Sequence, residues 1–278
     1  MEYIKKEDSI IILNPTDFDV KQTLECGQIF RFTVTGNNAF VCSGNKMAKL
    51  KTVDNSIEII SNDIDFFEDF FDLKTDYSLI KSKLVKDEFL MPAIEYGKGV
   101  RILKNDAYEM IISFIISANN NIKRIKKSIE ILCERFGDNM GDYYAFPTLC
   151  QLKCATEQDF INAGLGYRAK YMFETVQFLT VDMIEELKIK SKDEQFEFLL
   201  SLKGVGEKVA NCILLFGLGR KDVFPVDTWI NKVYNSLTNK EENNRKKITR
   251  ELTARYGELS GYAQQYFFYY YRDNNIKT

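Results

Sequence analysis

The residues of this sequence best suited to covalent chemistry are a lysine, Lys208, and an aspartate, Asp227. Lys208, Cys212 and Leu215 have the i, i+4, i+7 spacing of one helix face, so the lysine shares a stripe with a thiol and a leucine. Burial favours the uncharged form of an amine, and we therefore expect a lowered pKa for Lys208. A neutral amine can attack an electrophilic carbon and form a covalent intermediate.

Asp227 follows the extended segment Phe224–Val226 and precedes an apolar-periodic run that begins at Thr228. An aspartate in this place is typical of a helix N-cap, where its carboxylate accepts a hydrogen bond from a backbone amide. A cap at the edge of a cleft would also hold a negative charge towards a substrate. Plain capping explains the residue as well, and the two roles are compatible.

A glycine-rich turn, Gly204-Val205-Gly206, separates two helical patterns just before Lys208. Glycines one residue apart permit a tight turn and a close approach of backbone. The amides at the start of the following helix would then attract an anion such as a nucleic-acid phosphate. An ordinary connection between two helices would use the same glycines, so both interpretations stay open on this turn alone.

The chain contains no histidine. This excludes serine–histidine and cysteine–histidine nucleophile pairs and zinc sites with imidazole ligands, so catalysis must use Lys, Asp, Glu, Cys or Tyr. The six cysteines include no C-x-x-C pair, and we expect free thiols in a reducing compartment. The sequence therefore predicts neither a metal site nor an organic cofactor.

Charge and hydropathy favour a soluble protein of the cytoplasm. The net charge is 38 − 40 = −2, but Lys123, Arg124, Lys126 and Lys127 form a basic run that could bind phosphate or simply be a solvated face. The longest apolar stretch, Met110–Ala118, is too short for a membrane span. The N-terminus is charged from its second residue, so we expect no secretory signal.

The pattern of elements changes along the chain. Short β-branched and aromatic runs separated by turn residues predict an antiparallel sheet of about five strands in the first third, with runs at Ile10–Leu13, Ile29–Val34, Ala39–Ser43 and Ile57–Ile60. Helical periodicity follows at Asp106–Ala118, Ile122–Phe136, Glu157–Ala163, Ala169–Leu179, Lys192–Leu202, Glu207–Phe216, Asp227–Leu237 and Ala263–Arg272. The expected fold class is α+β, with a sheet domain at 1–97 and a helical domain at 98–278.

The segment around Lys208 and Asp227 resembles a known signature. It reads LKGVGEKVANCILLFGLGRKDVFPVDTWI and is similar to the hairpin, lysine and aspartate of the helix-hairpin-helix DNA glycosylase superfamily. Members with an iron–sulfur cluster place four cysteines after this aspartate, whereas no cysteine follows Cys212 here. The resemblance implies a DNA-binding hairpin at Gly204, Val205 and Gly206, and no cluster.

Within this superfamily the chain resembles the 8-oxoguanine DNA glycosylases, from Leu24 to Phe268 in several separate motifs. This resemblance implies excision of 8-oxoguanine opposite cytosine from duplex DNA in base excision repair. It also implies that Lys208 is the nucleophile that forms a Schiff base for lyase cleavage at the abasic site. Asp227 would stabilise the positive charge that develops on the sugar.

The same resemblance assigns a base pocket. CGQIFR matches the segment in which a glycine carbonyl, here of Gly27, accepts a hydrogen bond from the N7–H that guanine lacks. AQQYFF matches the last helix of the family, where Gln264 would bind the Watson–Crick edge and Phe268 would stack on the base. Cys212 would cover the opposite face. Core packing is the alternative for Phe268, because the helix is aromatic throughout.

Two further motifs resemble the DNA-facing loops of the family. SANNNIKRI and GLGYR place Asn119 in the gap left by the flipped base, Tyr167 in the base stack, and Arg124 and Arg168 against the unpaired cytosine. Extruding a base costs a few kcal/mol, so contacts of this kind are needed. Without the resemblance, the triple asparagine would be read as a loop and helix cap.

One position departs from the family. Animal and fungal members have a histidine two residues after the aspartate, where this chain has Trp229. An indole N–H donates one hydrogen bond but carries no charge, so the phosphate contact is altered. The short DNA-facing loops favour a prokaryotic protein, expected to act as a monomer at the nucleoid. Two other functions stay open: a glycosylase for another damaged purine, or a non-catalytic DNA-binding module.

Overall fold

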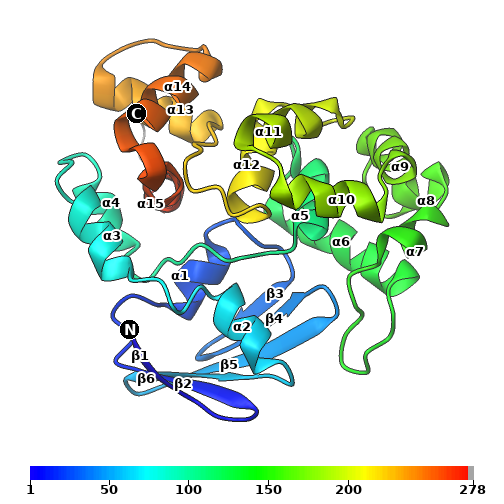
Figure 1. Ribbon diagram of the computed structural model, residues 1–278, viewed down its shortest axis with the longest axis horizontal. Helices are drawn as coiled ribbons and strands as arrows, with labels where there is room; N and C mark the ends of the chain where they lie inside the picture. The colour runs from blue at the N-terminus through cyan, green and yellow to red at the C-terminus, as the bar shows by residue number, and fades with distance from the viewer. Residues whose placement is uncertain (275–278) are drawn as a thin grey trace.

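The N-terminal part of the chain forms a six-stranded antiparallel sheet in the order β1-β2-β6-β5-β4-β3. The structure is a computed structural model that describes residues 1–274. Figure 1 shows the sheet along the lower edge of the molecule, with the helices above it. The strands are β1 (Glu2–Lys5), β2 (Ser9–Leu13), β3 (Phe32–Thr35), β4 (Asn38–Ser43), β5 (Lys46–Val53) and β6 (Ser56–Ile60).

Alternation of apolar residues fixes which face of the sheet is buried. Ile10 and Ile12 of β2 lie opposite Ile59 and Ile57 of β6, and all four are buried. Side chains two residues apart point to the same face of a strand, so these pairs form one apolar surface. The aromatic residues of α2 (Ile64–Phe70) join this surface in one core.

The α+β class is confirmed, and the predicted helices are all present. Fifteen α-helices are described: α1 (Val20–Glu25), α2, α3 (Tyr77–Leu84), α4 (Met91–Tyr96), α5 (Ala107–Ser117), α6 (Ile122–Phe136), α7 (Leu149–Lys153), α8 (Glu157–Asn162), α9 (Arg168–Phe178), α10 (Val181–Ile189), α11 (Lys192–Ser201), α12 (Glu207–Phe216), α13 (Thr228–Thr238), α14 (Arg245–Tyr256) and α15 (Ser260–Asp273). Sequence patterns did not predict the helices before residue 106, nor α7, α10 and α14, nor strands β1 and β5.

The predicted strand at 29–34 is wrong in its first half, since β3 begins only at Phe32. Hydrogen bonds from the side chains of Gln28 and Arg31 hold residues 29–31 as a loop. Gln28 Nε2 donates to the carbonyl of Arg101 at 2.7 Å, and Arg31 donates to the carbonyl of Tyr144 at 2.5 Å. These contacts tie residues 28–31 to the helical part of the chain.

The helices form a second core, in which α12 is central. It packs against α5 and α11, while α15 contacts α4, α13 and α14. Figure 1 shows α12 between the helices α5–α11 on one side and α13–α15 on the other. None of the helices within residues 1–274 is long and apolar enough to cross a membrane.

The predicted domain boundary between residues 97 and 98 stays a prediction. Helices α3 and α4 precede it, and their buried residues belong to the same core as those of α15. The second predicted domain ends with residues 275–278, which lie outside the described part of the chain.

Candidate active site and DNA interface

A cavity of about 60 Å³ lies where α12, α15, the loop after α1 and the start of α13 meet. Its lining contains all six residues predicted to act on the base or the sugar: Gly27, Lys208, Cys212, Asp227, Gln264 and Phe268. These residues come from four segments that are far apart in the sequence. Their convergence on one cavity makes it the candidate active site, while their individual roles stay predictions.

The hairpin before Lys208 has the predicted tight geometry. Gly204 has φ +80°, and a Cβ placed on it would lie 2.8 Å from Cδ2 of Tyr171, so only glycine fits both the backbone and the space. Gly206 is the N-cap of α12 and provides no side chain to cap the helix. The first amides of α12 are therefore left without side-chain acceptors and are available to bind an anion.

Lys208 is half-buried in the first turn of α12, with Nζ 5.7 Å from the ring centroid of Phe114. Burial is the strongest influence on its pKa and lowers it, but the neighbouring Cys212 and Asp227 outweigh burial. The pKa of Lys208 is therefore raised above its ordinary value of 10.5. The prediction of a lowered pKa is wrong, because the sequence did not reveal how closely these two groups approach the amine.

Asp227 is the N-cap of α13, as the sequence predicts. Its Oδ1 accepts a hydrogen bond from the amide of Ile230 at 2.9 Å. The preceding Pro225 and Val226 are buried, so the segment that positions the carboxylate at the cavity is held by packing. One carboxylate oxygen is committed to the cap, and the side chain as a whole borders the cavity beside Lys208.

The residues predicted to bind the base surround the cavity on several sides. The thiol of Cys212 is buried on α12, and burial raises its pKa, although Lys208 opposes this. Gly27 has φ +84° and lies against the ring of Phe268. Gln264 is 5% exposed, and its Oε1 has no hydrogen-bond partner among the described residues.

The four residues predicted to act on the DNA gap lie outside the cavity lining, in two neighbouring connections and in the first turns of the helices that follow them. Asn119 is exposed in the connection from α5 to α6, with φ +49°. Arg168 at the start of α9 is buried and donates to the carbonyls of Ala118 and Asn119, both at 2.6 Å. Tyr167 stacks on this guanidinium and is 57% exposed. Arg124 is exposed on α6.

Two family models cover most of the chain. Residues 112–258 match the HhH-GPD superfamily of base excision DNA repair proteins, and residues 10–111 match the N-terminal domain of 8-oxoguanine DNA glycosylase. The chain belongs to the HhH-GPD superfamily. The predicted resemblance and the predicted enzyme class, a DNA glycosylase, are confirmed.

This HhH-GPD protein has relatives in archaea, bacteria and eukaryotes. It is 32% identical over 234 residues to the "Probable N-glycosylase/DNA lyase" of Methanothermobacter thermautotrophicus, a match covering 75% of each protein. It is also 35% identical over 212 residues to the "N-glycosylase/DNA lyase" of Saccharomyces cerevisiae. This match covers 62% of the chain and only 56% of the yeast protein.

One solved structure matches nearly the whole chain. It is the Clostridium acetobutylicum 8-oxoguanine glycosylase/lyase in complex with double-stranded DNA containing cytosine opposite 8-oxoG. The sequences are 38% identical, the alignment covers 99% of both chains, and the TM-score is 0.92. The arrangement of sheet and helices described above is therefore that of a glycosylase/lyase seen on DNA.

Several residues that line the candidate active-site cavity of the HhH-GPD protein were not predicted from its sequence. Phe114, Phe216 and Gln265 were not singled out, although the structure places them in the lining. Phe114 and Phe216 lie in uniformly apolar runs, where no sequence signal distinguishes a pocket wall from core. Gln265 could have been found, because it is a second polar residue in an aromatic helix and lies three positions before Phe268.

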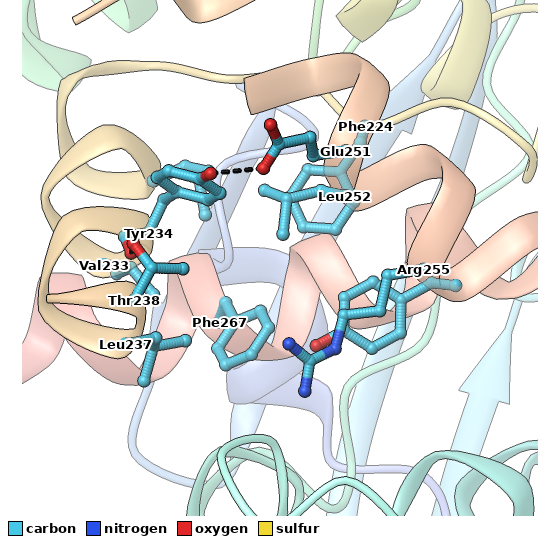
Figure 2. Close-up of a pocket in the computed structure, with 11 residues that line it drawn as sticks. Phe224, Val233, Tyr234, Leu237, Thr238, Glu251, Leu252, Arg255 and Phe267 are labelled. Atoms are coloured by element: carbon cyan, nitrogen blue, oxygen red, sulfur yellow. Dashed lines mark hydrogen bonds between the residues drawn. The ribbon is translucent and has the colours of Figure 1, made fainter. Parts of the chain in front are cut away.

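A second cavity, of about 110 Å³, lies between α13, α14 and α15. Figure 2 shows Tyr234 of α13 hydrogen-bonded to Glu251 of α14 at one end, with Leu237 and Phe267 at the other. Most of its lining is aliphatic or aromatic. It contains none of the predicted site residues, and we assign it to the packing of the helix that Asp227 caps.

Within residues 1–274, no group of three or more Cys, Asp or Glu side chains is placed to hold a metal ion. The six cysteines are free thiols, four buried and two exposed. The groups available for catalysis in the active-site cavity are therefore an amine, a carboxylate, two buried thiols and two carboxamides.

Proposed function

We propose that this protein excises 8-oxoguanine opposite cytosine from double-stranded DNA and then cleaves the abasic site through a Schiff base on Lys208. The observation that carries the proposal is the convergence of Lys208 and Asp227 with the four predicted base-binding residues on one cavity. The near-complete match to a glycosylase/lyase solved with cytosine opposite 8-oxoG supports the same substrate.

In the first step, the neutral amine of Lys208 attacks C1′ of the damaged nucleotide. The bond between C1′ and N9 breaks, and its electron pair leaves with the base, which takes up a proton. Asp227 stabilises the positive charge that develops on the sugar, a form of electrostatic catalysis that needs a fixed carboxylate. The α13 cap supplies that fixation, because the Ile230 amide holds Oδ1 in place.

In the second step, the nitrogen of Lys208 expels the ring oxygen from C1′ and becomes an imine. Loss of a proton from C2′ then allows the bond between C3′ and its oxygen to break, and the 3′-phosphate leaves with that electron pair. This elimination nicks the strand and uses no metal or organic cofactor. The ammonium group of Lys208 must lose a proton before its nitrogen can attack, and the nitrogen loses further protons as the imine forms. The raised pKa of Lys208 makes the first of these losses less favourable.

Recognition of the lesion rests on one hydrogen bond. The carbonyl of Gly27 accepts the N7–H of 8-oxoguanine, whereas guanine would present the lone pair of N7 to the same carbonyl. Two acceptors facing each other in a dry pocket cost about 1–3 kcal/mol, because neither can be solvated. Cys212 and Phe268 cover the two faces of the base, and Gln264 supplies the carboxamide for its Watson–Crick edge.

The cavity has to open before a base can enter. A cavity of about 150 Å³ is known to hold a single benzene ring, so one of about 60 Å³ is too small for a bicyclic purine. The ring of Phe268 lies against Gly27 and fills part of this space. Entry of the base therefore requires this ring to move away from Gly27 and to stack on the base instead.

Extrusion of the base is the task of the DNA-facing loops. The amides of the hairpin Gly204-Val205-Gly206 bind the backbone phosphate, while Asn119 fills the gap and Tyr167 enters the stack. Arg124 and Arg168 contact the unpaired cytosine. One base is handled by one chain, so we propose a monomer that acts at the nucleoid in the cytoplasm of a prokaryotic cell, as the bacterial and archaeal relatives suggest.

The proposal is tested by single-turnover release of base from duplexes with 8-oxoguanine opposite each of the four bases, and with guanine opposite cytosine. Release of 8-oxoguanine that is fastest opposite cytosine and absent for guanine supports it. Release of a different damaged purine, and not of 8-oxoguanine, would favour a glycosylase for that other lesion. Salt-dependent binding without release of any base would favour a non-catalytic binding module.

A further inference from the structure

Gln265 is a buried carboxamide with an unused hydrogen-bonding atom in the lining of the active-site cavity. Its residue is 2% exposed, and its Oε1 has no partner among the described residues. An unpartnered buried acceptor costs about 1–3 kcal/mol, and such groups are rare in folded proteins unless a ligand satisfies them. Gln265 thus has the same character as its neighbour Gln264, whose Oε1 is also buried and unpartnered.

The helix explains how two adjacent glutamines can line one cavity. Phe268 follows Gln264 by four residues and Gln265 by three, and both spacings bring side chains to the same side of a helix. Adjacent residues differ in direction by about 100°, so the two carboxamides flank the ring of Phe268 on opposite sides. All three side chains line the cavity, together with Gly27 on the facing loop.

The chemistry of the proposed substrate leaves a place for this second carboxamide. The Watson–Crick edge of 8-oxoguanine presents three groups in a row: the O6 acceptor, the N1–H donor and the 2-amino donor. One carboxamide pairs with at most two adjacent groups, one through its oxygen and one through its nitrogen. With Gln264 on this edge, one group stays unpaired in a pocket that excludes water.

We propose that Gln265 is a second base-recognition residue, which hydrogen-bonds the group of the Watson–Crick edge that Gln264 leaves unpaired. This inference rests on the proposed function, since it assumes that a flipped 8-oxoguanine enters the cavity. The oxygen and nitrogen of Gln264 match an adjacent donor and acceptor, which on this edge are N1–H and O6, so the group left over is the 2-amino donor. This donor suits the unpartnered Oε1 of Gln265, and a base analogue that lacks the 2-amino group tests the contact.

The test compares wild type with Gln265→Met, which keeps an unbranched side chain but removes both polar atoms. Gln195→Met is the matched control, because Gln195 is fully buried and both its polar atoms are used inside the protein, by Leu187 and Arg220. Single-turnover excision is measured on duplexes with 8-oxoguanine, with 8-oxohypoxanthine, which lacks only the 2-amino group, and with 8-oxo-2-aminopurine, which keeps the 2-amino group but lacks O6 and the N1–H. Strand cleavage at a ready-made abasic site is measured alongside.

The expected result is a 10- to 100-fold slower excision of 8-oxoguanine by Gln265→Met, from the loss of one buried hydrogen bond. This penalty should vanish on 8-oxohypoxanthine and persist on 8-oxo-2-aminopurine. Cleavage of the abasic site should stay within about threefold of wild type, since no base is read there. Gln195→Met should lose stability and no selectivity. Gln265→Leu, which also lacks polar atoms, serves if the methionine variant does not fold.

Three results would overturn the inference: full excision of 8-oxoguanine by the variant, an equal penalty on all three bases, or an equal penalty at the abasic site. The last two would mean that Gln265 only supports the structure. Failure of the proposed function is distinguishable from these results, because wild type itself would then release no 8-oxoguanine.

Discussion

The ring of Phe268 lies directly against Gly27. A Cβ placed on Gly27 would be 3.0 Å from Cε1 of Phe268, and the φ of Gly27 is +84°, which side chains rarely permit. Two residues from opposite ends of the chain thus meet in the lining of the candidate active-site cavity. The guanidinium of Arg272 reinforces this contact, because it donates to the carbonyl of Glu25 at 2.8 Å and lies over the Phe268 ring.

Gly27→Ala should impair base excision and spare cleavage of the abasic site. The added methyl group strains the backbone and occupies space between the base and Phe268, so we expect excision of 8-oxoguanine to slow about 10- to 100-fold, the effect of ~1.4–2.8 kcal/mol. Gly36→Ala is the matched control: φ is +57°, but nothing lies within 4 Å of the added Cβ. Equal losses in both variants would show that backbone strain alone is responsible.

Arg168→Lys should loosen the loop that carries Asn119. A lysine cannot reproduce the separate hydrogen bonds from the Arg168 guanidinium to the carbonyls of Ala118 and Asn119. We expect faster amide hydrogen exchange in residues 117–121 of the free protein, and weaker binding to lesion duplexes. Arg124→Lys should leave the exchange unchanged, because the exposed Arg124 side chain makes no such contact. Unchanged exchange in Arg168→Lys would contradict this role.

The trapping of abasic sites should be strongly pH-dependent. Since Cys212 and Asp227 raise the pKa of Lys208 despite burial, the neutral amine is scarce at neutral pH, and its fraction rises with pH, reaches one half at the pKa and levels off above it. Cys212→Ala removes one of these two influences, so the pKa of Lys208 should fall and the pH–rate profile should shift to lower pH. We expect faster imine formation than wild type at pH 8, measured by borohydride trapping. An unshifted profile would refute the coupling.

Glu109 should make stability depend on pH. Burial raises the pKa of this carboxyl from 4.5 to about 7, although Arg31 and the Gly44 amide oppose the shift. Between pH 4.5 and 7 the native state binds more protons than the unfolded state, so the free energy of unfolding falls as the pH rises through this window. The fall is at most about 1.4 kcal/mol per pH unit.

Glu109→Gln should flatten this dependence, because an amide does not titrate and its carbonyl can still accept from the Gly44 amide. The measurement is the urea midpoint at pH 5, 6 and 7 for both proteins. Glu134→Gln, at an exposed position on α6, is the control and should keep the wild-type slope. Identical slopes in wild type and Glu109→Gln would assign the pH dependence to other groups.

Local patterns predicted much of this structure. The spacing of apolar residues gave the long helices, and the cap at Asp227 and the turn at Gly204 followed from residue types that suit few other conformations. The hydrophobic pattern also placed the strands β2, β4 and β6 within a residue or so of their observed bounds. These features depend on residues that are close together in the sequence, so the sequence alone is enough to predict them.

Features that depend on distant contacts were not predictable in the same way. The pKa of Lys208 depends on Cys212, four residues along the same helix, and on the approach of Asp227 from the start of another helix, so burial alone gave the wrong direction. The hydrogen bond from the Arg168 guanidinium to the carbonyl of Asn119 joins α9 to the loop at the end of α5. Gln265 is one glutamine among aromatic residues, and only the folded chain shows that its oxygen is buried without a partner.

In the proposed reaction, Lys208 forms a covalent imine with the sugar of an excised 8-oxoguanine. Borohydride reduces this imine to a stable link, so trapping is compared for wild type, Lys208→Gln and the exposed-site control Lys188→Gln on duplexes bearing 8-oxoguanine, guanine or an abasic site. We predict a covalent complex with the first and third duplexes for wild type and Lys188→Gln, none with guanine, and none at all for Lys208→Gln. Undiminished trapping by Lys208→Gln, or no trapping of wild type on the 8-oxoguanine duplex, would contradict the account.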